Sequence, residues 1–280
     1  PGFRMRFDGT RVIALPGGPA EMIPMLENDV ISFLRGDDRS VLVSRLIRTW
    51  GESESAIGEQ LSDLYDASTN PSLAFLASGG EIKVRISAKA DDREHAENLI
   101  APIEATVRER LGSLVFGADT DTIEVVVLRL LEERGWTLGT AESATGGLVA
   151  ARITSVPGAS RVFRGSVVAY ATRMKESLLD VPAAQIAEHG VVSDPVGIAM
   201  AQGARAALGV DVAVGVTGSA GPDPQEQPVG SIVVAVATPD GVRARTLRMP
   251  GDRERVRTFA TTAALQLLRL SLQDVEWGTD

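Results

Sequence analysis

The residues of this 280-residue chain most suited to chemistry lie in segment 141–147 (AESATGG), where an apolar strand should end and a helix begin. In open α/β sheets, ligands bind beyond the carboxyl ends of the strands. Glycines such as Gly146 and Gly147 let the backbone approach a ligand, and free amides at a helix start carry partial positive charge. Ser143 is therefore a candidate nucleophile, with these amides as an oxyanion site for acyl transfer. The alternative is that Ser143 or Thr145 only caps the helix.

A serine nucleophile needs a base, and segment 170–175 (YATRMK), which follows the next expected strand, supplies a candidate. A partly buried lysine acts as a base once burial or a nearby cation lowers its pKa. Lys175 is the only lysine beyond Lys89, although arginines are frequent there, and an arginine cannot act as a base. Tyr170 could relay the proton or orient Lys175. The alternative is that Lys175 is a solvated helix residue.

Two further segments could bind an anion. Segment 216–223 (VTGSAGPD) follows an apolar strand and is rich in glycine and hydroxyl groups, as in loops that cradle a phosphate, although no Walker pattern is present. The alternative is a flexible connection. In segment 250–253 (PGDR), Asp252 should cap the last helix. Arg253 then opposes the helix dipole, which favours a phosphate-binding role over a plain surface position.

Other kinds of site are disfavoured by composition. The chain has no cysteine and only two histidines, which excludes disulfides, thiolate metal sites and cysteine nucleophiles and argues against a histidine metal site. His95 is interpreted as a surface residue and His189 as the end of a helix. Ser193 should cap the helix that begins near Pro195. We therefore expect neither a metal nor a cofactor.

The elements that must position these residues alternate along the third block of the chain, residues 117–280. The expected strands are 137–141, 162–171, 210–216, 230–237 and 242–248, and the expected helices are 121–133, 146–154, 195–208 and 252–272, with two short helices between 172 and 188. Asp119, Thr120 or Asp121 should cap the first helix. This alternation predicts an α/β sheet with helices on both faces.

Two smaller blocks precede it. Residues 36–116 predict a small α+β domain of order βαββα, with strands at 41–47, 72–78 and 81–88 and helices at 54–64 and 91–111. Ser53 is a candidate cap, and Gly79–Gly80 favours a hairpin. Residues 1–35 predict a strand at 11–15, a turn and a helix at 20–34, too little to hold a core alone. The chain starts without Met inside an apparent strand, which favours a truncated or proteolysed fragment.

Bulk composition narrows the partners. With 44% hydrophobic, 23% charged and 4% aromatic residues, the chain has an ordinary globular composition. Its formal net charge of -9 disfavours an extended nucleic-acid partner, whereas one arginine and a few amides would suffice for a small anion. No apolar run reaches the roughly 18 residues of a membrane span, and no secretory signal is present. We expect a cytoplasmic protein without nucleic-acid or membrane partners.

Taken in order, the segments resemble the C-terminal domain of the CinA family, the nicotinamide-mononucleotide deamidases. The matching segments are 140–147 (TAESATGG), Tyr170 with Lys175, 189–193 (HGVVS), 218–222 (GSAGP), 228–230 (PVG) and 251–253 (GDR). The resemblance covers about residues 119–272. Ala144 stands where relatives often have Cys, and Thr217 stands where Ser is common but keeps the hydroxyl.

This resemblance implies a three-layer α/β/α sandwich that hydrolyses nicotinamide mononucleotide to nicotinate mononucleotide and ammonia, in pyridine-nucleotide salvage. It also implies no metal and a homodimer or higher homo-oligomer. Ser143 would be the nucleophile and Lys175 the base, with Tyr170 assisting. The amide and phosphate pockets would be shaped by Thr145, Gly146, Gly147, Thr217, Gly218, Gly221 and Arg253.

Upstream, the chain resembles full-length CinA proteins. Residues 1–35 would be the tail of a molybdopterin-biosynthesis-like domain, 36–116 a KH-like domain and 117–280 the deamidase domain. Because the body of the first domain is missing, we expect no cleavage of ADP-ribose pyrophosphate. Two other readings stay open: a nucleotide-binding regulatory protein without turnover, and an interaction protein that uses the middle domain on nucleic acid, which the net charge disfavours.

Overall fold

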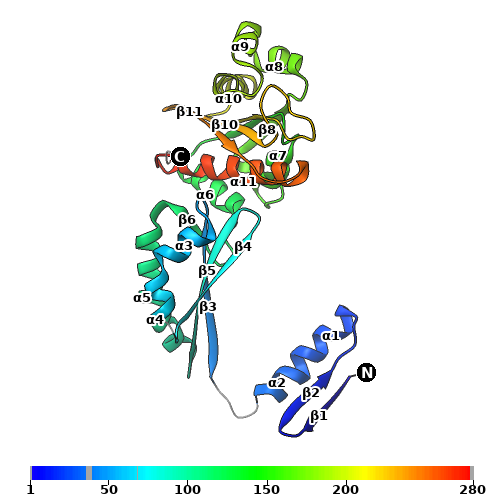
Figure 1. Ribbon diagram of the computed structural model, residues 1–280, viewed down its shortest axis with the longest axis vertical. Coiled ribbons are helices and arrows are strands. Elements are labelled where there is room, and N and C mark those ends of the chain that lie inside the picture. Colours follow the sequence, from blue (N-terminus) through cyan, green and yellow to red (C-terminus); the bar gives the residue numbers. More distant parts are fainter. Residues whose placement is uncertain (1, 36–39, 68, 278–280) are drawn as a thin grey trace.

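The computed structural model describes residues 2–35, 40–67 and 69–277, and its elements fall into three groups along the chain (Figure 1). The predicted boundary at residue 36 lies outside these ranges. No helix within them is long and apolar enough to cross a membrane.

The first group is a hairpin followed by a helical stretch. Strand β1 (Phe3–Phe7) pairs antiparallel with β2 (Thr10–Ala14), and α1 (Pro19–Met25), a π-helical turn (Leu26–Val30) and α2 (Ile31–Arg35) follow. The predicted strand and helix are thus present. Among residues 2–34 only Val30 is buried, which agrees with the expectation that this block holds no core of its own.

The second group is a four-stranded antiparallel sheet of order β4-β5-β3-β6 with helices against one face. Its elements are β3 (Val41–Thr49), α3 (Glu54–Gln60), α4 (Ser62–Ala67), β4 (Ser72–Ser78), β5 (Glu81–Ala90), α5 (Arg93–Leu111) and β6 (Val115–Ala118). The Ser53 cap is confirmed, since its Oγ accepts from Ala56 N at 3.2 Å. Ala96, Ile100 and Val107 recur at helical spacing along α5, and all three are buried.

Two details correct the predicted βαββα order. The expected helix 54–64 is interrupted at Leu61, and β6, which was not predicted, pairs with β3. Four residues are too few to show the alternation that identifies a strand. Strand β6 also crosses the predicted boundary between residues 116 and 117, so the sheet of the small domain continues to Ala118.

The third group is a mixed five-stranded sheet of order β11-β10-β9-β7-β8, in which β7 pairs parallel with β8 and β9, and β10 pairs antiparallel with β9 and β11. Its strands are β7 (Leu138–Glu142), β8 (Phe163–Val168), β9 (Val212–Gly218), β10 (Ser231–Thr238) and β11 (Gly241–Arg248). Its helices are α6 (Ile123–Arg134), α7 (Leu148–Thr154), α8 (Thr172–Leu179), α9 (Ala183–His189), α10 (Asp194–Leu208) and α11 (Arg253–Leu272).

The helices cover both faces of this sheet. Helix α10 packs on β9 and β10 with α8 and α9 beside it, while α11 packs on the opposite face with α6 and α7 (Figure 1). Strands β9 and β10 are buried along nearly their whole length by Val, Ile and Ala side chains, as expected for strands covered on both faces. The predicted three-layer α/β/α sandwich is confirmed.

The capping residues of two helices in this domain, α11 and α6, were predicted, one of them correctly. Asp252 caps α11 as predicted, accepting from Arg255 N at 2.9 Å. The predicted cap of α6 was wrong, because Thr122 holds that position. Asp121 instead accepts from Ala118 N, and it thereby fixes the turn that joins the two domains.

Candidate active site

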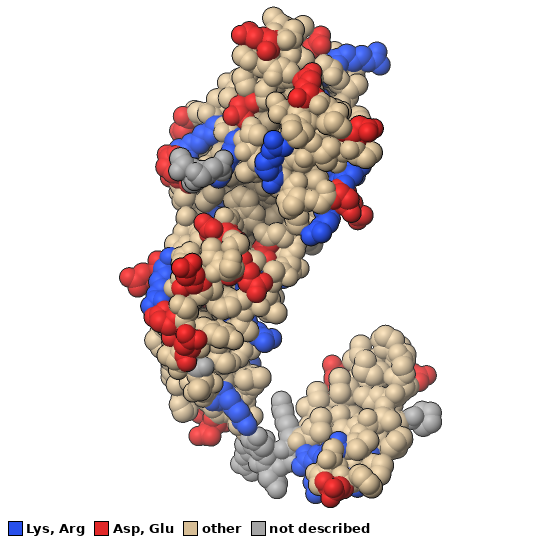
Figure 2. Space-filling model, viewed as in Figure 1, with Lys and Arg blue, Asp and Glu red and all other residues tan. Residues whose placement is uncertain are grey.

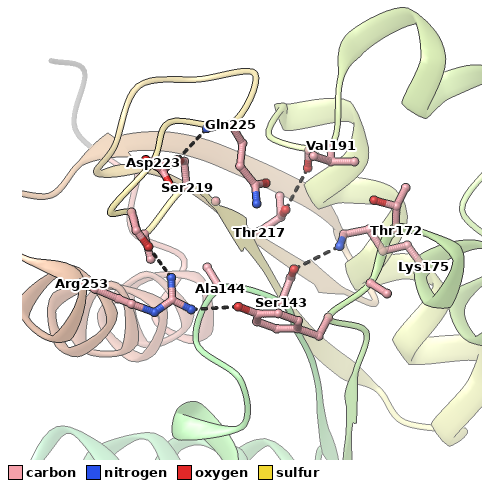
Figure 3. A pocket seen from close by; sticks show the side chains of 15 residues that line it. Ser143, Ala144, Thr172, Lys175, Val191, Thr217, Ser219, Asp223, Gln225 and Arg253 are labelled. Atoms are coloured by element: carbon pink, nitrogen blue, oxygen red, sulfur yellow. Dashed lines mark hydrogen bonds between the residues drawn. The ribbon is translucent and has the colours of Figure 1, made fainter.

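A cavity of about 390 Å³ opens where β7 and β9 end, and five segments distant in sequence line it (Figure 3). Parallel strands bring their carboxyl ends to one edge of a sheet, which is where ligands bind in open α/β folds. The lining residues are Ser143, Ala144, Tyr170, Ala171, Thr172, Lys175, Val191, Thr217, Gly218, Ser219, Ala220, Gly221, Asp223, Gln225 and Arg253.

Ser143 and Lys175 meet in this cavity. Lys175 Nζ lies 3.0 Å from Ser143 Oγ and donates at 3.1 Å to the carbonyl of Ala169. The two residues are only 8% and 2% exposed, and burial lowers the pKa of the Lys175 ammonium. No carboxylate within the described ranges forms an ion pair with Lys175. A lysine in this setting loses its proton more readily and can accept the serine proton.

The hydroxyl of Ser143 is free for this contact because another residue caps α7. The Glu142 carboxylate accepts from the amides of Gly147 and Val149 through Oε2, at 2.9 and 3.1 Å, and from Ala150 N through Oε1 at 2.9 Å. The alternative that Ser143 or Thr145 caps this helix is therefore wrong. The predicted oxyanion site at the helix start is corrected too, since these amides already have an acceptor.

Glu142 is fully buried, and we expect Glu142→Gln to lower the free energy of unfolding by about 2–3 kcal/mol. The substitution removes the charge and points an NH₂ group at backbone N–H donors, and hydrogen bonds to charged groups contribute about 1.5–3 kcal/mol. Urea unfolding would measure the shift in midpoint. The exposed Glu133→Gln is the control, with an expected change below about 0.5 kcal/mol. Equal midpoints for Glu142→Gln and the wild type would contradict the capping role.

Three residues predicted to bind substrate do not line the cavity. Gly146 and Gly147 adopt φ angles of +62° and +98°, which other residues rarely adopt, so they are required by the turn itself. Thr145 is fully buried. Its Oγ1 has no hydrogen-bond partner within the described ranges. These three residues shape the turn at residues 143–147, the Ser143 turn, and their side chains are not among those that line the cavity.

Thr145→Val should therefore retain activity within about threefold and leave stability equal or up to about 2 kcal/mol higher. Valine keeps the shape and removes a buried hydroxyl whose lost hydration no hydrogen bond replaces. Enzymatic activity and thermal unfolding would be measured together. Thr217→Val is the comparison, because the Thr217 hydroxyl does donate, to Val191 O at 2.8 Å, and its loss should be destabilising. A large loss of activity in Thr145→Val would restore a substrate-binding role.

At the other end of the cavity, Arg253 and Tyr170 lie together. Arg253 donates to Tyr170 Oη at 2.8 Å and to Gly221 O at 2.5 Å. Tyr170 is 60% exposed and makes no hydrogen bond with Lys175 or Ser143 within the described ranges. The predicted relay through Tyr170 thus has no contact to support it. The pair instead places a guanidinium and a phenol at the cavity, two groups of the kind that can bind an anion.

The predicted loop residues Thr217, Gly218 and Gly221 do line the cavity. Gly218 has no room for a side chain, since a Cβ would lie 2.6 Å from Ser231 O on β10. Segment 189–193 supplies the facing wall through Val191. His189 ends α9 as predicted, whereas Ser193 precedes α10 without capping it, since its hydroxyl donates to Gly190 O.

Sequence reasoning missed Arg257. Its Nε donates to Ala144 O at 3.2 Å and its Nη2 to Thr145 O at 2.8 Å, so it holds the Ser143 turn from the side of α11. The available signal was its spacing, because Arg257 lies four residues after Arg253 and so on the same side of the helix.

The fold and site define a class of protein: a three-layer α/β/α domain with a buried serine–lysine pair at the carboxyl ends of its strands. Residues 120–272 match the CinA C-terminal domain, and residues 44–117 match the damage-inducible protein CinA KH domain. The chain belongs to the CinA family.

Individual relatives agree. The chain is 48% identical to a CinA-like protein of Frankia casuarinae over 97% of its own length and 64% of that protein. It is 44% identical to a putative competence-damage inducible protein of Symbiobacterium thermophilum over 96% of its length and 67% of that protein. It thus spans about two thirds of the length of these relatives.

Solved structures give the same family for the C-terminal domain. The competence damage-inducible protein A of Klebsiella pneumoniae is 33% identical, with a TM-score of 0.53, over 54% of this chain and 95% of that one. A CinA superfamily protein of Escherichia coli is 31% identical, with a TM-score of 0.51, over 54% of this chain and 92% of that one.

Proposed function

We propose that the chain is an amidohydrolase that converts nicotinamide mononucleotide to nicotinate mononucleotide and ammonia, in pyridine-nucleotide salvage. The observation that carries this proposal is the 3.0 Å contact between Lys175 Nζ and Ser143 Oγ, in a cavity where both groups are buried. A hydroxyl nucleophile beside a desolvated amine is the arrangement that acyl transfer requires.

The reaction proceeds in two steps. Neutral Lys175 accepts the proton of Ser143 as Oγ attacks the carboxamide carbon, which forms a C–O bond and places negative charge on the carboxamide oxygen. Protonated Lys175 then gives its proton to the departing nitrogen, and ammonia leaves as the C–N bond breaks. Water attacks the resulting ester with Lys175 again as base. Ser143 regains its proton, and the nicotinate product departs.

The remaining cavity suits a mononucleotide. Its volume of about 390 Å³ falls in the range of small-molecule sites. Arg253 with Tyr170 offers a place for the phosphate, while the Ser143–Lys175 pair offers one for the amide. The two ends thus accept the two polar ends of one small nucleotide.

Ammonia release from nicotinamide mononucleotide, followed with a coupled assay, tests the proposal. Release at a rate above that of the Lys175→Ala and Ser143→Ala variants supports it. Tight nucleotide binding without ammonia release would instead support the second reading, a nucleotide-binding regulatory member of the family.

A further inference from the structure

The negative charge that forms on the substrate oxygen needs hydrogen-bond donors. Most amides of the Ser143 turn and of the first turn of α7 already have an acceptor. Those of Gly147, Val149 and Ala150 donate to Glu142. The amide of Gly146 donates to Ser143 O at 3.1 Å. An oxyanion would therefore need donors other than these four amides.

Two amides of the turn remain without an acceptor within the described ranges, those of Ala144 and Thr145. Both residues are buried, at 6% and 0% exposure. A buried N–H group without an acceptor is rare in proteins because it loses its hydration without replacement. Two such groups directly after the nucleophile are donors held ready for an acceptor that the substrate brings.

The direction of the Thr145 amide follows from the contact between Arg257 and the Ala144 carbonyl. The C=O and N–H of a trans peptide unit point in opposite directions. Arg257 binds the Ala144 carbonyl, and Arg257 itself does not line the cavity, so the N–H of Thr145 is turned away from Arg257. Ala144 lies beside Ser143 in the cavity (Figure 3). The guanidinium charge also polarises this peptide unit, which strengthens donation by its N–H.

We propose that the amides of Ala144 and Thr145 form the oxyanion site for the Ser143 reaction and that Arg257 is the positioning residue that holds them. The residue after a serine nucleophile supplies an oxyanion donor in other hydrolase folds as well. The inference rests on the proposed function. It also assigns separate tasks to two arginines of α11, since Arg253 lines the cavity and Arg257 binds the carbonyls of the turn.

The test compares kcat and KM for nicotinamide mononucleotide in Arg257→Ala, Arg257→Lys and a matched control. Arg257→Ala should lower kcat by about 10²–10³-fold, the effect of losing one oxyanion donor, with KM within about threefold. The kcat of Arg257→Lys, which keeps the charge, should lie between those of the wild type and Arg257→Ala. If Arg257→Ala does not fold, Arg257→Lys takes its place in the comparison. The control is Arg255→Ala at an exposed position, and its kcat and KM are expected within twofold of the wild-type values.

Two further measurements separate positioning from general structural support. Guanidinium chloride at about 50 mM, far below denaturing concentrations, should restore part of the kcat of Arg257→Ala and none of that of Ser143→Ala. A fluorophosphonate labels Ser143 by forming an O–P bond as fluoride leaves, with the serine proton passing to Lys175. Its labelling rate, followed by intact mass, should fall at least tenfold in Arg257→Ala.

The outcomes are distinct. A wild-type chain that releases no ammonia contradicts the proposed function, and the labelling rate then decides the inference independently of any substrate. Equal labelling rates in Arg257→Ala and the wild type overturn the inference. So does a kcat for Arg257→Ala within threefold of the wild type, or a raised KM with unchanged kcat.

Discussion

Replacing Ser143 by alanine is expected to lower kcat for ammonia release by roughly 10⁴–10⁶-fold, the range found when a serine nucleophile is removed from a hydrolase. Oγ is the only atom of this residue that can form the acyl intermediate. Nucleotide binding should persist within about threefold, because the Arg253 end of the cavity is unchanged. Steady-state kinetics and calorimetric titration with the product would measure the two effects separately.

The comparison variant is Ser219→Ala, which removes a second buried hydroxyl from the same cavity. Ser219 Oγ accepts from Gln225 N, so its loss loosens the loop and should cost less than about tenfold in kcat. A Ser143→Ala variant with more than a few per cent of wild-type activity, or equal losses in both variants, would rule out Ser143 as the nucleophile.

The meeting of Ser143 and Lys175 was predictable because it depends on strand direction. Ser143 follows β7 and Lys175 follows β8, and these strands are parallel neighbours, so both segments must emerge at one edge of the sheet. Strand β11 runs antiparallel to β10, which runs antiparallel to β9. Its end, followed by Arg253, therefore lies at that edge too. The directions of these strands therefore determine which residues meet at this edge of the sheet, without any side-chain detail.

The roles of Glu142 and Arg257 could not be predicted in the same way. Glu142 is the last residue of a buried strand, where a charged side chain is unexpected, and only the turn that follows brings three amides to its carboxylate. Arg257 reaches carbonyl groups more than 110 residues earlier. Both contacts depend on side-chain torsions and on the packing of α11 against the turn, which hydrophobic periodicity does not encode.

The same limit explains why Thr145 was wrongly predicted to line the cavity. A hydroxyl followed by two glycines at a strand end resembles a ligand-binding loop, but Gly146 and Gly147 adopt positive φ angles in a tight turn, and Thr145 is fully buried beside them. Composition identified the turn correctly, whereas the side of it that faces the cavity was set by backbone geometry.

Lys175→Met is expected to lower kcat strongly and at the same time to stabilise the protein at neutral pH. Removing the base should lower kcat by about 10²–10⁴-fold. Methionine loses two hydrogen bonds, worth about 1 kcal/mol each. An ammonium buried without a counter-ion costs several kcal/mol, so the removal of the charge should outweigh the lost bonds. Thermal or urea unfolding of both proteins would show the gain.

Lys175→Arg is the matched variant, because it keeps a buried cation that cannot act as a base. It should be as inactive as Lys175→Met but no more stable than the wild type. Lower stability of Lys175→Met than of the wild type at pH 7 would mean that the hydrogen bonds to Ser143 and Ala169 outweigh the burial of the charge.

The free energy of unfolding and kcat/KM should both depend on pH, and the lowered pKa of Lys175 gives the sign of each dependence. The pKa of Lys175 is lowered in the folded protein from the ordinary value of 10.5 by burial. Below the lowered pKa the lysine is charged in both states, and the full cost of burying it is present. Between the lowered pKa and 10.5 the unfolded chain binds a proton that the folded chain does not, so wild-type stability rises with pH. The advantage of Lys175→Met should therefore shrink across this window. Wild-type kcat/KM should rise through the lowered pKa, because only the neutral amine can accept the proton of Ser143, and a flat profile would contradict Lys175 as the base.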